Sequence, residues 1–522
     1  MKKHDYFLIF IILLLFKPFS TFSQIHEGDT AHFWSVSYID WPPLWGVPQH
    51  DITAVCKKKG QHCSIMVETT AIQPSQGSID SMTLLFDHDF YPSLTAKYGP
   101  IPDVFDHDTS VFLLVMTEHN WSGYFDPAQQ MTDSMVFSRW GRHSSEHEII
   151  YIAAQDFEPY AQGIISHEFG HLLHWGRDHS PEPPAHPVTF WEDAFIDEGF
   201  STFAAIYLTE DIFQRSVPDY SAFFNSNPDI PLIWFTNYNQ VKLFMLFMFE
   251  HYGQWNYVTE LINNQLNGIP GVDSTLHALG FSEHFDDVFE QWSVANFIDD
   301  SLYDGGKYEY AHYKFPPCLV NSEYNTYPLS TENGSLSAFG SDYISFRSDS
   351  PKNVSIHFHG EAGKKFCLAF IQQDINTGRT LKVDRVFPDV SNYAAYHADS
   401  LDISYNRLIM DAMCIDSTVH YSDSALYSYS VSDFVEGINE ISSSEGLLIY
   451  PNPASDNILV KIPGDQYKRG SYILYDYTGK CVMSGITDNL NISLNVSMIK
   501  SGLYYFKYTG IRSTYGGRFI KK

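Results

Sequence analysis

Short apolar runs separated by polar, turn-forming segments mark the first part of the chain. Four of these runs have the length and the β-branched or aromatic content that is typical of strands. They are Ile52–Cys56, Cys63–Glu68, Ser110–Met116 and Glu148–Ile152. The pattern therefore predicts a sheet in this part of the chain, with its last strand just before residue 153.

After the fourth run the apolar positions recur at helical spacing. Apolar residues stand at positions 164, 165, 169, 172 and 173, which predicts a helix with one buried side. Residues 191–205 predict a second helix. Residues 238–253 predict a third, which is apolar nearly all round and should therefore be buried, with the glycine at 253 as its stop signal. Helical patterning continues through Phe285–Trp292.

The polar side of the first predicted helix carries the segment His167-Glu168-Phe169-Gly170-His171. Residues four positions apart lie on one face of a helix, so both imidazoles can bind the same ion. Glu168 stands beside them, where it can take a proton from metal-bound water. This combination predicts a zinc site rather than a core helix with two incidental histidines.

A catalytic zinc site of this kind needs a third ligand, which does not follow at the short spacing HExxHxxGxxH. Position 174 is His instead of Gly, and position 177 is Arg instead of His. His174 lies on nearly the same face as His171, where a packing or hydrogen-bonding role is the commoner one. The carboxylates further along the chain are Asp178, Glu182, Glu192, Asp193, Asp197 and Glu198.

The second predicted helix resembles a helix of the gluzincin peptidases. Its segment Asp197-Glu198-Gly199-Phe200-Ser201 is similar to the Asn-Glu-Gly-Phe-Ala segment whose Glu completes the zinc site in that group, and the likeness is strongest to the hyicolysin-like secreted metallopeptidases. The resemblance implies that His167, His171 and Glu198 hold one zinc ion per chain. The 26 residues between His171 and Glu198 are more than the aminopeptidase pattern has, and Glu192 is the competing ligand.

Three further residues have expected roles beside the ligands. Glu168 acts as the general base and passes its proton to the leaving amine. Tyr238, which opens the third predicted helix, matches the tyrosine that hydrogen-bonds the developing oxyanion in the gluzincin aminopeptidases. Asp197 supports a ligating histidine from behind. The implied activity is that of a secreted zinc metallopeptidase, an endopeptidase by preference, which acts on protein or peptide substrates.

Two other functions are compatible with the same residues. One is a catalytically inactive surface binding or adhesion protein on a metallopeptidase scaffold, although a degenerate site tends to lose the base or a ligand. The other is a zinc hydrolase that acts on a non-peptide substrate. Fold resemblance alone does not choose among substrates.

Charge and the N-terminal pattern indicate an exported protein. The formal net charge of −30 excludes a typical nucleic-acid binder, which needs clustered Lys and Arg. Residues 1–23 predict a signal peptide, with two lysines, an apolar core at 7–16 and small residues before the cleavage point. That core is too short to span a membrane and no later run is long enough, so we expect no transmembrane helix in the mature chain. Cys56 and Cys63 predict one local disulfide in an oxidising compartment.

Changes in patterning divide the chain into parts. The predicted fold class is α+β: a gluzincin-like catalytic domain at 24–305, with a sheet and active-site helices, followed by two β-sandwich domains. The first sandwich, at 306–435, has short alternating runs separated by turn residues and no chemical constellation, so packing or substrate docking is its expected role. Residues 436–446 have the composition of a linker.

Residues 447–522 resemble the C-terminal sorting domain of type IX secretion. The resemblance rests on the opening Tyr450-Pro451-Asn452-Pro453, the strand segment Gly502-Leu503-Tyr504 and the basic chain end. It implies that the type IX machinery is a partner. It also implies export through the periplasm and outer membrane, with release or surface attachment. Without the resemblance these residues predict a small β-sandwich.

The tetrapeptide Phe-Asp-His-Asp occurs twice, at 86–89 and at 105–108. A calcium site built on it would need more oxygen ligands than the sequence offers nearby. Asp-rich turns are commoner, so a structural role is the expectation.

Overall fold

The computed structural model describes residues 25–36, 49–102, 110–118, 121–178, 192–209, 222–234, 237–312, 316–433, 447–463, 470–510 and 514–522. The chain divides into two compact units. One holds residues 1–191 and 204–210, and the other holds residues 192–203 and 211–522. The division therefore falls inside helix α5 (Ala194–Thr209). The predicted signal peptide and linker lie outside the described residues, and the predicted domain boundaries stay predictions.

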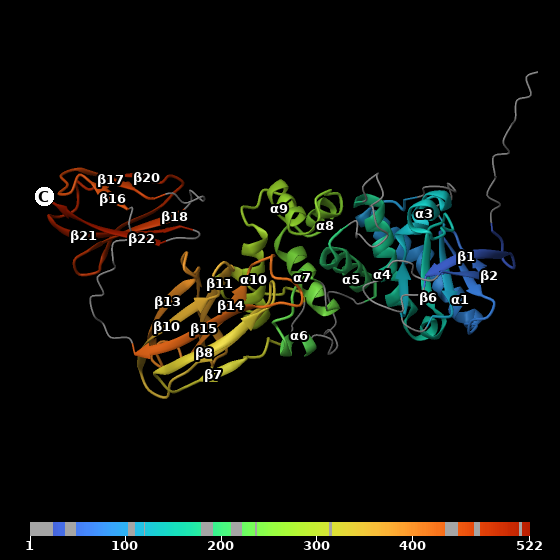
Figure 1. The fold of residues 1–522 in the computed structure, drawn as a ribbon, viewed down its shortest axis with the longest axis horizontal. Coiled ribbons are helices and arrows are strands. Elements are labelled where there is room, and N and C mark those ends of the chain that lie inside the picture. Colours follow the sequence, from blue (N-terminus) through green and yellow to red (C-terminus); the bar gives the residue numbers. More distant parts are fainter. Residues whose placement is uncertain are drawn as a thin grey trace, which may run out of the picture. The chain divides into compact units, whose positions relative to one another are not determined.

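The first unit is built on a six-stranded sheet with the order β1-β2-β3-β4-β6-β5 (Figure 1). Neighbouring strands β3, β4 and β6 are parallel and buried along their whole length, as expected for strands covered on both faces. The four strand predictions are confirmed, because the four runs lie in β2, β3, β4 and β6. The strands are β1 (Thr30–Val36), β2 (Gln49–Lys59), β3 (Cys63–Glu68), β4 (Val111–Met116), β5 (Gly123–Phe125) and β6 (Ile149–Ala153).

Helices pack against this sheet. Helix α4 (Ala154–Asp178) follows β6 without a loop and contacts β4, β5 and β6, whereas α1 (Gln76–Leu85) contacts β2 and β3. The π-helix η1 (Phe86–Phe90) joins α1 to α2 (Tyr91–Tyr98), which in turn contacts α4. The loop after β5 carries the 3-10 helix η2 (Pro127–Gln130) and the helix α3 (Asp133–Trp140). Strand β5 thus stands at one edge of the sheet, opposite to β1 in the strand order, and contacts α4.

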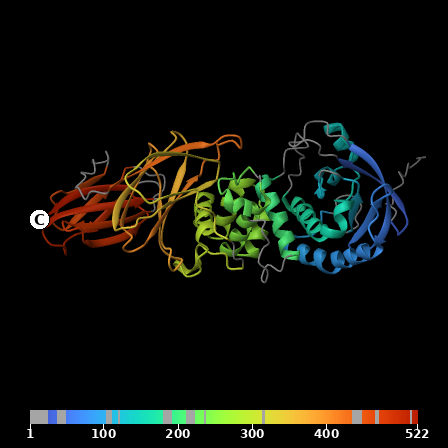
Figure 2. The ribbon, with the colours of Figure 1, turned by 90° about the horizontal axis from the view of Figure 1, so that it is seen from below.

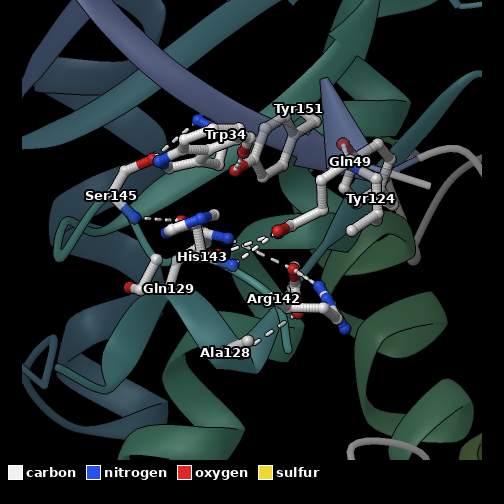
Figure 3. Close-up of polar contacts among 12 residues, drawn as sticks. Trp34, Gln49, Tyr124, Ala128, Gln129, Arg142, His143, Ser145 and Tyr151 are labelled. Atoms are coloured by element: carbon white, nitrogen blue, oxygen red, sulfur yellow. Dashed lines mark hydrogen bonds and ion pairs between the residues drawn. The ribbon is translucent and has the colours of Figure 1, made fainter. Parts of the chain in front are cut away.

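A polar network fixes the edge strand β5 to the rest of its unit (Figure 3). The hydroxyl of Tyr151 on β6 donates to the carbonyl oxygen of Trp34 on β1 (2.6 Å), and the ring of Tyr124 on β5 stacks on Tyr151 with centroids 4.3 Å apart. Behind β5, Arg142 forms a buried ion pair with Asp126. Aromatic stacking and buried charge-assisted bonds are both strong contacts, so one fixes β5 to β6 and the other fixes the residue that follows β5.

The second unit begins with helices. They are α5, α6 (Ala222–Ser226), α7 (Tyr238–His251), α8 (Trp255–Ile262), α9 (Gly268–Ala278) and α10 (Phe285–Ile298). The third predicted helix, which is apolar nearly all round, is confirmed as α7, whose residues 240–249 are all buried. Its first turn is capped by the Asn237 side chain, which accepts from the N–H groups of Asn239 (3.0 Å) and Gln240 (3.1 Å). After its end, Gly253 has a φ of 110°, a conformation that favours glycine.

Two sheets of the second unit, with the orders β13-β10-β15-β8 and β12-β11-β14-β9-β7, face each other. Rings from both sheets meet between them: Phe358 and Phe366 have centroids 5.5 Å apart, and Phe370 and Tyr396 have centroids 3.9 Å apart. This part of the predicted β-rich fold is confirmed. The strands are β7 (Ser322–Tyr324), β8 (Leu329–Leu336), β9 (Ser341–Phe346), β10 (Lys352–Gly360), β11 (Phe366–Asp374), β12 (Arg379–Val386), β13 (Tyr393–Leu401), β14 (Arg407–Cys414) and β15 (Ala425–Asp433).

The C-terminal module is also built from two sheets, with the orders β16-β17-β20 and β19-β18-β21-β22. Alternate residues of its strands point inward and form one apolar core that includes Ile458, Leu474 and Phe506. Its strands are β16 (Leu448–Tyr450), β17 (Asn457–Lys461), β18 (Gly470–Asp476), β19 (Cys481–Thr487), β20 (Asn491–Asn495), β21 (Gly502–Gly510) and β22 (Thr514–Lys521). The expectation of a β-rich module at this end is confirmed.

The predicted disulfide between Cys56 and Cys63 is wrong. Both thiols are free and buried. The register of β2 and β3 places Cys56 opposite Met66 and Lys59 opposite Ser64, so the two cysteines do not face each other across the hairpin. In the part of the chain that the structure describes, no helix is long and apolar enough to cross a membrane.

Candidate metal centre

The first predicted helix is confirmed as α4, and its amphipathic pattern explains which side of it is buried. Ile165, Phe169, Leu172 and Leu173 are fully buried on its apolar side. The helix is longer than predicted, because it begins directly at the end of β6. A helix that continues a central strand and buries three turns of apolar residues is a rigid support for side chains on its other face.

The side chains of His167 and His171 on α4 point their Nε2 atoms toward each other. Their Nε2 atoms are 3.2 Å apart, and their rings meet edge to face at an interplanar angle of 84°. Two nitrogens bound to one zinc at about 2.0–2.1 Å in tetrahedral geometry lie roughly 3.3 Å apart. The arrangement of His167 and His171 therefore fits two ligands of one ion, as the spacing along the helix predicts.

Glu168 lies between the two histidines along the helix and is 7 % exposed. The edge strand β5 passes close to it, because Gly123 has no side chain. A Cβ atom at Gly123 would lie 2.4 Å from Cγ2 of Ile164 and 3.6 Å from Cγ of Glu168. Only glycine lets the strand approach the helix this closely, so Gly123 brings an extended edge strand alongside the proposed general base. A lone glycine in the sequence carries no signal of this role.

Among the described residues, two groups of side chains are close enough to hold a metal ion. The ligand atoms of His167, His171 and Glu198 all lie within 4.8 Å of one another, and so do those of His174, Asp178 and Glu192. The first group is the ligand set that the gluzincin resemblance implies. Two neutral imidazoles and one carboxylate form a typical catalytic zinc set with a coordination position left for water, so these residues fit that ion.

Close packing explains why position 199 is a glycine. A Cβ atom there would lie 2.6 Å from Cγ of Met245 on α7. Helices α5 and α7 therefore approach each other closely next to Glu198, which limits how far α5 can shift. The Asp-Glu-Gly sequence on α5 combines a ligand candidate with the small residue that this helix pair needs.

Glu192, the competing ligand, is engaged elsewhere. It is 2 % exposed, and its Oε1 accepts from the N–H groups of Asp193 (2.5 Å) and of Gly268 at the start of α9 (2.7 Å). The carboxylate thus caps a helix N-terminus within its own unit. The second group brings it together with His174 and Asp178, not with the two histidines of the motif.

His174 is fully buried, and its Nε2 lies 3.8 Å from Oδ2 of Asp178 one turn later on the same helix. The full burial of His174 agrees with the expected packing role. Asp197 is 8 % exposed on α5, and its support of a ligating histidine stays a prediction.

Tyr238 is the first residue of α7 and is 47 % exposed, so its ring reaches solvent. Its role with the oxyanion also stays a prediction.

The first Phe-Asp-His-Asp segment forms η1. The carboxylate of Asp87 accepts from the N–H groups of Gln61 (2.7 Å) and His62 (2.8 Å) in the β2–β3 turn, so this copy has the structural role that was expected. The second copy, at 105–108, lies outside the described residues.

Comparison with protein families identifies the C-terminal module. Residues 448–522 match the family described as secretion system C-terminal sorting domain. The module is a type IX sorting domain. The protein is therefore exported by the type IX secretion machinery to the cell surface or the medium, and that machinery is a partner of the chain. The Tyr-Pro-Asn-Pro opening and the strand that begins at Gly502 carried this signal in the sequence.

Comparison with curated proteins gives no match. Among solved structures, the chain is similar to the pre-peptidase C-terminal domain of a collagenase from Bacillus anthracis, at 17 % identity and a TM-score of 0.16, covering 22 % of this chain and 97 % of that one. It is also similar to PirA, at 8 % identity and a TM-score of 0.15, covering 19 % of this chain and 92 % of that one. A β-glucuronidase of Faecalibacterium prausnitzii is similar at 10 % identity and a TM-score of 0.13, and the match covers 37 % of this chain and 36 % of that one.

Proposed function

We propose that the protein is an exported zinc-dependent peptidase of the gluzincin kind, hyicolysin-like, with one zinc per chain. The observation that carries the proposal is the 3.2 Å separation of the Nε2 atoms of His167 and His171 on α4, in one group with Glu198. The same helix places Glu168 between them. A pair of imidazoles, a carboxylate and an adjacent second carboxylate are the parts that metal-assisted hydrolysis needs.

Each residue has a role in the proposed reaction. His167, His171 and Glu198 would hold the ion, which when bound would act as a Lewis acid toward the scissile carbonyl and toward water. Glu168 takes the proton from the attacking water and passes it to the leaving amine, so one carboxylate acts first as base and then as acid. The low exposure of Glu168 keeps bulk water away from this proton transfer.

The edge strand β5 supports a peptide rather than another substrate. Among the described residues, β5 pairs as a strand only with β6, antiparallel, and it stands at one end of the strand order of its sheet. Its other side can pair with the backbone of an extended peptide, as an added strand. Because Gly123 lies close to Glu168, a peptide bound along β5 would pass the general base. This arrangement favours an endopeptidase, since backbone pairing needs no free amino terminus.

The proposal predicts that the secreted chain contains one zinc per molecule and hydrolyses casein. A strong chelator should remove both the zinc and the activity, and added zinc should restore the activity. Zinc content is measured on the purified protein, and hydrolysis is followed by release of soluble peptides. One bound zinc without cleavage of any peptide would contradict a peptidase and indicate the binding-protein or the non-peptide alternative. A chain without zinc would contradict the ligand set itself.

Tyr238→Phe should lower kcat with little change in zinc content. A single O–H donor to an oxyanion contributes roughly 10²–10³-fold to kcat, and the substitution removes only that group. Tyr160→Phe is a matched control, because Tyr160 is an exposed tyrosine on α4 that precedes the motif by two turns. The measurement is kcat and KM on one peptide, with zinc determined in parallel. An unchanged kcat would remove Tyr238 from the site.

A further inference from the structure

The turn that joins β8 to β9 extends from its sandwich into the helices of the same unit. Phe339 lies in this turn and is 1 % exposed. Its ring packs edge to face against two rings of α10: Phe285, with centroids 4.9 Å apart, and Phe289, with centroids 5.1 Å apart. Figure 1 shows α10 beside the sandwich strands β11 and β14, and Figure 2 shows the green helices next to the yellow and orange strands.

The backbone of this turn is strained. Phe339 has a φ of 54°, in the left-handed region that a bulky side chain rarely adopts. Such a conformation persists only where the surrounding structure holds it. Here the Phe339 N–H donates to the carbonyl oxygen of Cys414 (2.8 Å), and its own carbonyl oxygen accepts from Leu232 (3.4 Å). At the next position, Gly340, a Cβ atom would lie 2.3 Å from Oδ1 of Asp229.

The same turn binds the loop that precedes α7. The N–H of Ser337 donates to Oδ1 of Asp229 (2.6 Å), and the N–H of Ser341 donates to the carbonyl oxygen of Pro228 (3.2 Å). Further along this loop, the indole N–H of Trp234 donates to the carbonyl oxygen of Val419 in the sandwich (2.8 Å). Several independent bonds therefore attach the segment before Tyr238 to the sandwich.

Helix α10 is also bonded to the sandwich by buried polar groups. The hydroxyl of Ser293 donates to Oδ2 of Asp411 on β14 (2.7 Å), and the hydroxyl of Tyr343 on β9 donates to the carbonyl oxygen of Ser293 (2.7 Å). Burial raises the pKa of Asp411 well above its usual range. The helix thus rests on β9 and β14 through buried hydrogen bonds.

From α10 the packing continues to the helix that carries Glu198. The ring of Phe285 meets Phe195 of α5 with centroids 5.8 Å apart, and it meets Phe244 of α7 with centroids 5.6 Å apart. Phe195 stands three residues before Glu198, on the neighbouring turn of the same helix face. All three rings are fully buried, and interiors at native density transmit displacement rather than absorb it.

We infer that the β8–β9 turn at residues 337–340 is a positioning element, which sets the place of α5 and of the start of α7 through Phe339 and Phe285. The sandwich is then part of the framework of the proposed metal centre and not a separable docking module. The inference rests on the proposed function for the ligand role of Glu198, while the packing route itself lies wholly within the second unit.

The test compares two phenylalanines of the sandwich in the full secreted chain. Phe339→Ala removes the contact with α10. Phe358→Ala is the matched control, because Phe358 is also 1 % exposed but packs on Phe366 and Tyr427 inside the sandwich. Two readouts are taken: the zinc dissociation constant by competition with a chromogenic chelator, and amide hydrogen exchange in residues 194–203 of α5. Phe339→Leu is the milder variant, which keeps an apolar side chain in the turn.

Phe339→Ala should raise the zinc dissociation constant by at least about tenfold and should speed exchange in α5 by a similar factor. Phe358→Ala should leave both within about twofold despite its own loss of stability, and Phe339→Leu should fall between. Equal effects of the two Ala variants, or no effect of either, would overturn the inference. If the unaltered chain binds no zinc, faster exchange in α5 with Phe339→Ala alone would retain the coupling while the proposed function fails.

Discussion

Glu168→Gln should leave zinc bound and lower kcat by about 10²–10⁴-fold. The substitution removes the proton acceptor but keeps the shape of the side chain and the three proposed ligands. Few other side chains fit at position 168, since Glu168 is 7 % exposed and strand β5 lies close to it at Gly123. Glutamine fills the same space with a neutral amide, so the loss in kcat measures the base and not a rearranged helix.

A matched control lies on the same helix. Glu158 of α4 is exposed, and its carboxylate accepts from the N–H of Ser75 (2.8 Å), far along the helix from the histidines. Glu158→Gln makes the same chemical change and should retain full activity. Zinc content and kcat are measured for both variants on one peptide substrate. Undiminished hydrolysis by Glu168→Gln would remove the general base from the mechanism.

The parts of the site that lie close together in sequence could be predicted. His167, Glu168 and His171 occupy little more than one helical turn, so the 3.6-residue period alone places the two imidazoles on one face. The apolar residues at positions 164, 165, 169, 172 and 173 predict the buried side of α4, and Ile165, Phe169, Leu172 and Leu173 are buried there. The pattern of α7, apolar nearly all round, likewise favours the interior of the unit.

The choice between Glu198 and Glu192 depends on contacts that are distant in sequence. Glu192 caps α9 through the N–H of Gly268, a residue 76 positions away. Nothing in the pattern around Glu192 indicates this partner. The gluzincin resemblance favoured Glu198 from a motif, whereas the structure supplies a physical reason why Glu192 is engaged elsewhere.

Close approach of two backbones is equally invisible in the sequence. Gly123 in a three-residue edge strand and Gly199 beside Glu198 matter because Ile164 and Met245 lie opposite them. The wrong disulfide prediction has a related cause. Short spacing between Cys56 and Cys63 suggested a bond, but strand register decides which side chains face each other, and an irregularity between Cys56 and Lys58 shifts that register.

The alternating pattern of the sandwich predicts its strands but not its contacts with the helices of the second unit. A connection as short as Ser337-Ala338-Phe339-Gly340 between two antiparallel-sandwich strands is typical of a surface turn. In the structure, Phe339 has a positive φ and its ring packs against Phe285 of α10. The turn therefore packs against the helices instead of only joining β8 to β9. Local preference loses to tertiary contacts at this position, and such exceptions are expected where one part of a protein positions another.

Glu198→Ala should weaken zinc binding by more than the roughly 10–100-fold that loss of an outer partner costs, because it removes one of three direct ligands. Glu192→Ala should leave zinc affinity within about tenfold. It should instead lower the free energy of unfolding by about 1–3 kcal/mol, since the buried N–H of Gly268 loses its acceptor. The two variants are thus expected to differ in kind: one loses metal with its fold retained, and the other loses stability with its metal retained.

Both quantities are measured on each variant, zinc affinity by chelator competition and stability by thermal unfolding of the metal-free chain. Using the metal-free chain matters, because bound zinc stabilises the folded state and would otherwise convert a loss of affinity into an apparent loss of stability. The reverse result, with zinc lost from Glu192→Ala and kept by Glu198→Ala, would transfer the metal to the group with His174 and Asp178. Glu168 would then stand apart from the ion, and the proposed peptidase mechanism would lose its base together with its ligand.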